Sequence, residues 1–197
     1  MVLRNKCSAK NHDRTPSLKP LYVIADQTMK IELIDYDRSW TDLFEKEKAL
    51  LKKVLPDNST IEHIGSTSIT NLCAKPVIDI LCGLDDFSVA DSLVENIVGL
   101  NYEYIDKYTP LIPERRFFRK YIEHKFHIHL VQTGGDWWNR HILFRDYLRK
   151  NVWSKNEYAV LKRQLAEKDW TDANEYADAK TDFIKTIEQK AGYSNYS

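Results

Sequence analysis

The sequence predicts one α/β domain of the α+β kind, in which a short sheet is flanked by helices and the C-terminal segment is helical. Three observations predict it. The length of 197 residues is that of one ordinary domain. Hydrophobic residues make up 43% of the chain, which is enough to form a substantial core. Strand-like and helix-like patterns alternate at first, and helix-like patterns alone follow from about residue 136.

The N-terminus differs from the rest and is predicted to be a flexible basic extension covering residues 1–28. Six Lys and Arg residues face two acids within the first 30 residues, a net charge of +4. Pro16 and Pro20 interrupt regular structure there. Such a terminus is either dispensable or a basic arm that contacts a partner. The domain itself is expected at residues 29–192, followed by a disordered tail at residues 193–197.

Each regular element is predicted from its own local pattern. An alternating run at residues 31–34 predicts a strand, and apolar residues at helical spacing after Ser39 predict a helix that ends at Pro56. Ser154 and Thr171 are the expected caps of the last two helices. The further strands are expected at residues 60–64, 77–82, 102–105, 115–121 and 125–132, and the further helices at residues 87–98, 136–150, 155–168 and 172–191.

Charge and cysteine content exclude several classes of protein. The 29 basic and 29 acidic residues cancel, whereas proteins of bulk nucleic acid usually carry a basic excess that neutralises phosphates. Nucleic acid is therefore not an expected partner. Three cysteines without a Cys-x-x-Cys pair indicate a reducing compartment. No membrane contact is expected, because no apolar run reaches the roughly 20 residues that span a bilayer, and a cytoplasmic location follows.

The turn after residues 60–64 is the first candidate ligand site. Gly65 has no Cβ, so a ligand can approach the backbone closely there. Backbone N–H groups and the hydroxyls of Ser66, Thr67 and Ser68 could hold phosphate oxygens. A Gly-Ser pair is also common in ordinary turns, and the motif alone leaves both interpretations open.

One carboxylate and two imidazoles form the second candidate site. Asp79 lies in the apolar run at residues 77–82, where an ionised group must be paired or bound to a metal. His127 and His129 alternate with apolar neighbours, so in a strand they share one face and could chelate a divalent ion. The alternatives are an Asp79 paired with a nearby Lys or Arg, and histidines that are only structural.

Four cationic residues cluster at residues 115–120. Strand alternation places Arg115 and Arg119 on one face and Arg116 and Lys120 on the other. Guanidinium groups bind phosphate bidentately, so one of these pairs suits a triphosphate. A charged edge strand in solvent explains the same pattern.

Read together, these segments resemble the GrpB-like family. That family is placed in the nucleotidyltransferase superfamily, and the resemblance implies a short mixed sheet flanked by helices. The superfamily pattern is a Gly-Ser turn, two acids on the next strand and a third acid on a later one, which bind divalent metal and align a nucleoside triphosphate. The matching blocks are residues 62–68, 75–80, 115–120, 127–129 and 144–149, within a resemblance that runs from about residue 31 to residue 189.

Position by position, Gly65 and Ser66 match the turn and Asp79 the first acid, whereas Leu81 stands where the second acid is expected. A histidine replaces the third acid. The resemblance therefore implies a Mg or Mn site, with catalytic roles for its ligands, formed by Asp79, His127 and His129. The residues expected to bind the nucleotide are Gly65, Ser66, Thr67, Ser68, Lys75, Arg116 and Arg119.

Two functions are compatible with this pattern. The first is a metal-dependent nucleotidyltransferase that binds a nucleoside triphosphate and transfers a nucleotidyl group to a small molecule or protein. The second is a catalytically silent nucleotide- or coenzyme-binding module that assists a partner enzyme, such as one of coenzyme A metabolism. Leu81 favours the second. The C-terminal helices are expected to cover the sheet or to form a subunit contact, as in a homodimer, and His141 could approach the site from residues 136–150.

Overall fold

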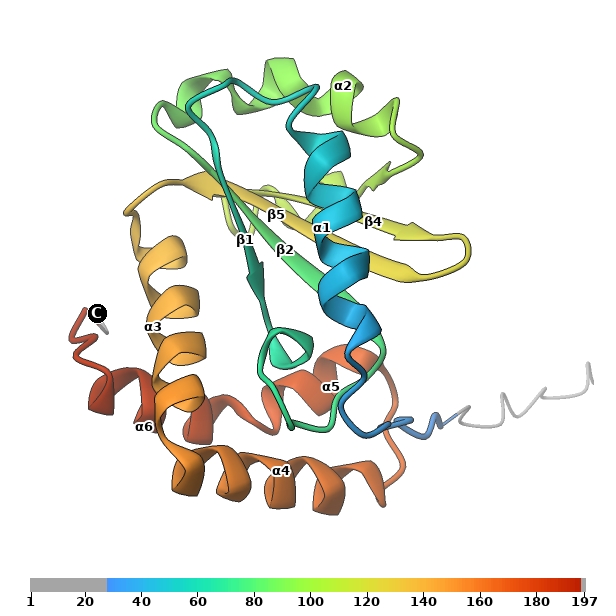
Figure 1. The fold of residues 1–197 in the computed structure, drawn as a ribbon, viewed down its shortest axis with the longest axis vertical. Helices are drawn as coiled ribbons and strands as arrows, with labels where there is room; N and C mark the ends of the chain where they lie inside the picture. The colour runs from blue at the N-terminus through green and yellow to red at the C-terminus, as the bar shows by residue number, and fades with distance from the viewer. Residues whose placement is uncertain (1–27, 196–197) are drawn as a thin grey trace, which may run out of the picture.

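A five-stranded mixed sheet organises the computed structural model, which describes residues 28–195 (Figure 1). The strand order is β1-β2-β5-β4-β3, with β2 and β5 parallel and every other neighbouring pair antiparallel. This mixed sheet, flanked by helices, confirms the predicted fold class. The strands are β1 (Thr60–Ile64), β2 (Val77–Leu84), β3 (Glu103–Tyr104), β4 (Arg115–Tyr121) and β5 (Lys125–Gln132).

Helices pack on both faces of the sheet and at one of its ends, with α1 on one face and α3 on the other. In Figure 1, α1 crosses the sheet, while α4, α5 and α6 gather at the end opposite α2. None of the helices within residues 28–195 is both long and apolar enough to cross a membrane. The α-helices are α1 (Ser39–Leu51), α2 (Val94–Val98), α3 (Asp136–Lys150), α4 (Val152–Ala166), α5 (Ala173–Asp178) and α6 (Thr181–Lys190), and the 3₁₀ helices are η1 (Ser66–Ser68), η2 (Phe87–Leu93) and η3 (Asp106–Tyr108).

Strand alternation gives the two faces of the sheet different chemistry. On one face, Ile78, Ile80 and Ile128 are buried in the main apolar core with α1. On the other face, the parallel register pairs Asp79 with His127 and Leu81 with His129. Because paired residues of neighbouring strands point to the same side, Asp79, His127 and His129 all lie on this second face. It is called the polar face below.

Several predicted elements differ from those observed. Residues 31–34 form no strand, because Ile34 alone of this segment is paired, in a single β-bridge with Ala74. Residues 87–98 begin as a 3₁₀ helix and only end as α-helix. Residues 172–191 form two helices, because a tight turn, in which the Lys180 N–H donates to the Ala177 carbonyl at 3.2 Å, ends the first.

The two predicted helix caps are wrong in opposite directions, since Ser154 comes three residues after the observed cap and Thr171 one residue before it. The Asn151 side chain accepts from the Ser154 N–H at 3.0 Å, so α4 starts before the expected Ser154. Asp172, not Thr171, caps α5 by accepting from the N–H groups of Asn174 and Glu175. Asn and Asp are at least as strong as Ser and Thr in this role.

The two expected termini lie largely at the limits of the described residues. The extension predicted at residues 1–28 falls, apart from residue 28, outside them, and so do residues 196–197 of the predicted tail. Tyr193, the first residue of that tail, is buried, and its hydroxyl donates to the Asn195 carbonyl at 3.3 Å.

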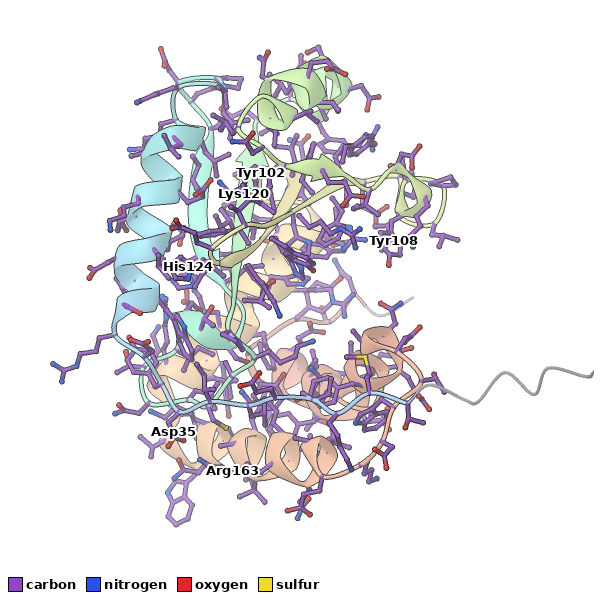
Figure 2. The ribbon with its side chains drawn as sticks, turned by 90° about the vertical axis from the view of Figure 1, so that its right-hand side faces the viewer. Asp35, Tyr102, Tyr108, Lys120, His124 and Arg163 are labelled. Atoms are coloured by element: carbon purple, nitrogen blue, oxygen red, sulfur yellow. The ribbon has the colours of Figure 1, made fainter. Side chains whose placement is uncertain are left out.

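A buried ion pair ties β4 to α1. The Lys120 ammonium bonds to a carboxylate oxygen of Glu47, and the Tyr102 hydroxyl donates to the same oxygen at 3.0 Å (Figure 2). Burial, followed by the charge of Glu47, raises the pKa of Tyr102 far above its usual range, so its hydroxyl stays a donor. Lys120 is therefore held in the core by this ion pair and cannot bind a ligand on the polar face.

Replacing Lys120 tests this pair. In Lys120→Met the Glu47 carboxylate loses its cation inside the core, which should lower the free energy of unfolding by about 3 kcal/mol or more. Lys46→Met, an exposed change on the same helix as Glu47, should change it by less than about 0.5 kcal/mol. Urea denaturation of both variants measures the difference, and equal stabilities would contradict a structural role for the pair.

Candidate ligand-binding site

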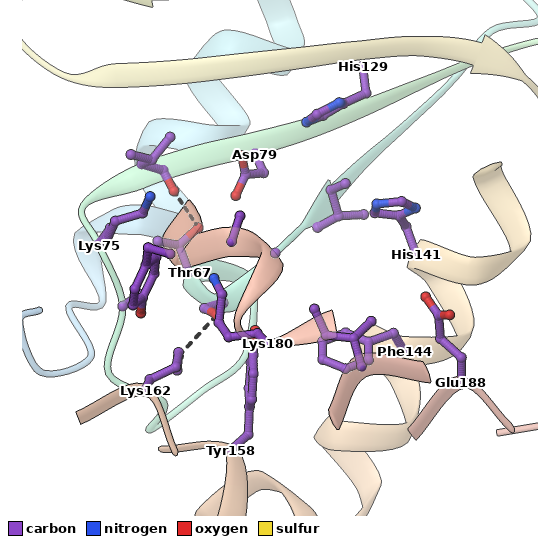
Figure 3. A pocket seen from close by; sticks show the side chains of 18 residues that line it. Thr67, Lys75, Asp79, His129, His141, Phe144, Tyr158, Lys162, Lys180 and Glu188 are labelled. Atoms are coloured by element: carbon purple, nitrogen blue, oxygen red, sulfur yellow. Dashed lines mark hydrogen bonds between the residues drawn. The ribbon is translucent and has the colours of Figure 1, made fainter. Parts of the chain in front are cut away.

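A cavity of about 320 Å³ opens between the polar face of the sheet and the C-terminal helices (Figure 3). The sheet contributes Asp79 and His129, the turn after β1 contributes Ser66, and helices α3 to α6 close the other sides. The further lining residues used below are Gly65, Thr67, Lys75, His141, Phe144, Tyr158, Lys162, Tyr176, Lys180, Ile184 and Glu188. The cavity therefore exists only because distant parts of the chain converge.

Gly65 is required by the geometry of the turn that follows β1. Its φ is +68°, a backbone conformation that side chains with a Cβ rarely adopt. A Cβ at this position would also overlap the Asp79 carboxylate oxygen Oδ2. Only glycine lets the turn lie directly against this carboxylate, so the Gly65–Asp79 contact fixes where Ser66 enters the cavity.

The three hydroxyls after Gly65 have different partners. Thr67 donates to the Val77 carbonyl at 3.0 Å, and it accepts at 3.0 Å from Nε2 of His63, whose pKa burial lowers to about 4. Ser68 donates to the carbonyl of Gly65 at 2.7 Å. Ser66 alone of the three meets a cation, with its Oγ 3.0 Å from Nζ of Lys162. Of the hydroxyls expected to bind phosphate, Ser66 is thus the one in position.

Three lysines give the cavity its positive charge. Lys75 comes from the loop before β2, Lys162 from α4 and Lys180 from the turn before α6. Burial lowers the pKa of Lys162 to about 7, and burial with repulsion from Lys75 lowers that of Lys180 to about 8. The Tyr176 ring lies under both Lys75 and Lys180, with ammonium-to-centroid distances of 5.2 Å and 4.2 Å.

Lys162 is the most deeply placed of these cations. Its side chain is 2% exposed, and Nζ donates to the Cys73 carbonyl as well as to Ser66. Of the three lysines, only Lys75 was predicted from the sequence to bind the nucleotide, and Lys162 and Lys180 were not. Lys162 could have been identified from the sequence, because it lies between Tyr158 and Leu165 on the buried side of α4. Lysines are almost never fully buried there unless their charge is paired.

Asp79 and His127 are brought together as the sequence analysis expected. Nδ1 of His127 lies 3.2 Å from Oδ1 of Asp79, and its Nε2 lies 2.7 Å from the Tyr121 hydroxyl. Both side chains are partly exposed, at 24% and 28%. Asp79 therefore has the Gly65 turn on one side and an imidazole on the other.

His129 belongs to a different group of side chains. It lies between the rings of Phe117 and Trp137, at centroid distances of 5.1 Å and 4.7 Å, and its Nδ1 is 3.4 Å from a guanidinium nitrogen of Arg115. Burial, then the Arg115 charge, lowers the pKa of His129 well below its usual value. Burial likewise lowers the pKa of His141, stacked on Trp137 at 3.6 Å, to about 4. These imidazoles form a neutral wall of the cavity.

The side chains present do not fit a divalent metal. Among residues 28–195, no group of three or more His, Cys, Asp or Glu side chains could hold a metal ion. Asp79, His127 and His129, the expected set, are therefore not such a group, and Nδ1 of His129 lies instead 3.4 Å from a guanidinium nitrogen of Arg115. Leu81, at the place of the second acid, is fully buried with Ile64 and Val131 in an apolar cluster. Three ammonium groups in the same cavity also disfavour a cation.

The two arginines expected to bind phosphate lie on opposite faces. Arg119 is on the polar face, where it pairs with Glu103 at 2.6 Å. Arg116 pairs in register with Leu130, so it points to the other face and is held there by Asp91 at 2.5 Å. Its expected place in the nucleotide site was therefore wrong, since a strand residue one position from Arg115 must point away from it.

Comparisons with known proteins agree on one family. The family model described as GrpB protein matches residues 30–190. The UPF0157 protein SCO7215 of Streptomyces coelicolor is 31% identical over 180 residues, covering 91% of this chain and 94% of that relative. The UPF0157 protein YqkA of Bacillus subtilis is 39% identical over 168 residues, 82% of this chain, and the chain spans 47% of its length.

A solved structure is similar as well. The crystal structure of conserved protein GrpB from Enterococcus faecalis superimposes with a TM-score of 0.71 at 35% sequence identity. The match covers 81% of this chain and 96% of that one.

The close approach of Gly65 to Asp79 can be separated from simple backbone strain. Gly65→Ala and Gly134→Ala both place a Cβ at positive φ, at a cost of about 1–2 kcal/mol each. Only Gly65 has a neighbour that the Cβ would overlap, since nothing lies within 4 Å at Gly134. Urea denaturation should therefore show Gly65→Ala to be less stable than Gly134→Ala by about 1–3 kcal/mol. Equal losses would contradict the contact.

Proposed function

The chain belongs to the GrpB family, and from this premise we propose that it binds the phosphate groups of a nucleoside triphosphate, or of a related phosphorylated small molecule, in this cavity. One observation carries the proposal: Lys75, Lys162 and Lys180, which are far apart in the chain, converge on a single cavity beside the hydroxyl of Ser66. Hydrogen bonds from charged donors to phosphate are among the strongest in proteins.

The carboxylates of the cavity offset the charge of these lysines only in part, since Asp79 favours the charged forms of Lys75 and Lys180 but burial still lowers the pKa of both. Asp79 lies beside His127 at 3.2 Å, and Glu188 pairs with Arg140 at 3.1 Å. The lowered pKa values of Lys162 and Lys180 indicate that the free protein holds their positive charge at a cost. A bound anion relieves that cost, because it adds negative charge beside ammonium groups that Asp79 offsets only in part.

The remainder of the cavity suits the non-phosphate part of a nucleotide. Tyr158, Phe144 and Ile184 provide aromatic and aliphatic surface next to the lysines. Its volume of about 320 Å³ is at the lower end of the range of ligand sites, roughly 300–1,000 Å³. A compact nucleotide is therefore a better match than a bulky coenzyme.

The lysines take the role that a divalent ion has in the expected mechanism. In the proposed complex, ammonium groups neutralise the phosphates, and the Gly65–Ser66 turn holds one phosphate oxygen through the Ser66 hydroxyl. Asp79 positions this turn and is not a metal ligand. We therefore propose binding that does not require Mg or Mn.

Calorimetric titration with ATP, GTP, CTP and UTP, with and without Mg²⁺ or Mn²⁺, tests the proposal. Lys75→Met and Lys180→Met should each weaken binding of the preferred nucleotide about 10- to 100-fold, the value of one hydrogen bond to a charged group. Lys190→Met, an exposed change on α6, is the matched control and should bind like the wild type. Absence of binding to all four nucleotides, or unchanged affinity in both variants, would contradict the proposal.

The lowered lysine pKa values predict a dependence of binding on pH. In the free protein, Lys162 and Lys180 lose their protons as the pH rises through about 7 and about 8. Phosphate binds the protonated form of Lys180, so affinity should fall as the pH rises from 7 to 9, and binding at pH 8 should take up protons. Titration in buffers of different ionisation enthalpy measures that uptake, and an affinity independent of pH across this range would contradict the assignment.

A further inference from the structure

Ser66 and Lys162 form a hydrogen-bonded pair that phosphate binding alone does not explain. Their Oγ and Nζ atoms are 3.0 Å apart, and Nζ also donates a hydrogen bond to the Cys73 carbonyl. The ring of Tyr158, one helical turn before Lys162 on α4, lies 4.8 Å from the same ammonium. Lys162 is thus held in one position against a single hydroxyl, whereas Lys75 and Lys180 lie across the Tyr176 ring.

We propose that Ser66 is a nucleophile, that Lys162 accepts its proton, and that the protein forms a covalent nucleotidyl–serine in this cavity. The proposal rests on the proposed function, because the electrophile is the phosphate chain of the bound nucleoside triphosphate. A serine whose hydroxyl is hydrogen-bonded to a buried lysine is a known arrangement for activating a nucleophile.

The step balances with groups that are all present. Oγ of Ser66 attacks the α-phosphorus, and the bond from that phosphorus to the bridging oxygen of the β-phosphate breaks. The electron pair leaves with pyrophosphate, whose charge Lys75 and Lys180 neutralise. The proton of the Ser66 hydroxyl moves to the neutral amine of Lys162. The product is a phosphodiester between Ser66 and the nucleoside, from which an acceptor could take the nucleotidyl group.

Lys162 and Lys180 differ in pKa and therefore have different roles in the proposed reaction. Burial brings the pKa of Lys162 to about 7, near which a general base works best. Lys180, with a pKa of about 8, stays largely protonated at neutral pH and keeps its charge for the phosphates. Burial raises the pKa of Tyr158 far above its usual range, so the phenol keeps its proton at neutral pH.

The other hydroxyls of the turn after Gly65 and the two buried cysteines are unsuited to this role. Thr67 is bonded to His63 and to the Val77 carbonyl, and Ser68 to the Gly65 carbonyl. Cys73 and Cys82 are buried, and burial raises the pKa of the Cys82 thiol far above its usual value. The geometry therefore selects Ser66.

Labelling of the full-length protein with radioactive nucleotide tests the proposal. The purified chain is incubated with the nucleotide that it binds best, labelled at either the α- or the γ-phosphate, and then denatured. The α-label should remain on the protein and the γ-label should not. Mass spectrometry should find one nucleoside monophosphate on Ser66, and Ser66→Ala should carry none.

Lys162→Arg separates proton transfer from charge. Arginine keeps the positive charge but does not lose its proton in proteins, so nucleotide binding should persist while the labelling rate falls at least about 100-fold. Lys162→Met tests the same role without the larger side chain, and Arg163→Met, the exposed neighbour on α4, is the matched control. Thermal melting and nucleotide affinity are measured on every variant, so that loss of fold is recognised.

The pH profile gives a readout that a structural role would not change. At saturating nucleotide the labelling rate should rise with pH as Lys162 loses its proton, while affinity falls. Binding without α-label, label on another residue, retention of the γ-label, or wild-type labelling by Lys162→Arg would each overturn the proposal and leave the proposed function intact. Absence of nucleotide binding would overturn both.

Discussion

The placement of positive charge beside a polar sheet face is the constraint on which the account depends. Lys162 extends from α4 to reach Ser66 and the Cys73 carbonyl, where it is almost completely shielded from solvent. A buried ammonium with a pKa near 7 reduces stability unless something compensates for its charge. Two further lysines in the same cavity increase that cost, and such a concentration of like charge is characteristic of functional sites.

The fold explains how one cavity collects residues from so many elements. The parallel β2–β5 pair sets Asp79 and His127 opposite one another, and the Gly65 turn fits against Asp79 because glycine has no Cβ. Helices α4 to α6 then close the end of the sheet and supply Lys162 and Lys180. The metal expected from the superfamily pattern has no matching ligand set among residues 28–195. In the proposed complex the lysines supply the positive charge instead.

Local patterns predicted the sheet side of the site but not the helical side. Alternation along β5 was enough to place His127 and His129 on one face, because a strand repeats every two residues, whereas the position of Asp79 beside His127 follows from the β2–β5 register. The same rule should have excluded Arg116 from a site shared with Arg119. Lys180 could not be found from the sequence, since nothing in residues 172–191 marks the turn that splits α5 from α6. Lys162 could have been found as a lysine within an apolar helical stripe.

The most direct test of the central claim is to titrate the lysine side chains by NMR, with and without inorganic triphosphate. The account predicts that Lys162 and Lys180 titrate near 7 and 8 in the free protein and shift upward when the anion binds. Lysines that titrate near 10.5, the ordinary value, and do not respond to triphosphate would contradict it.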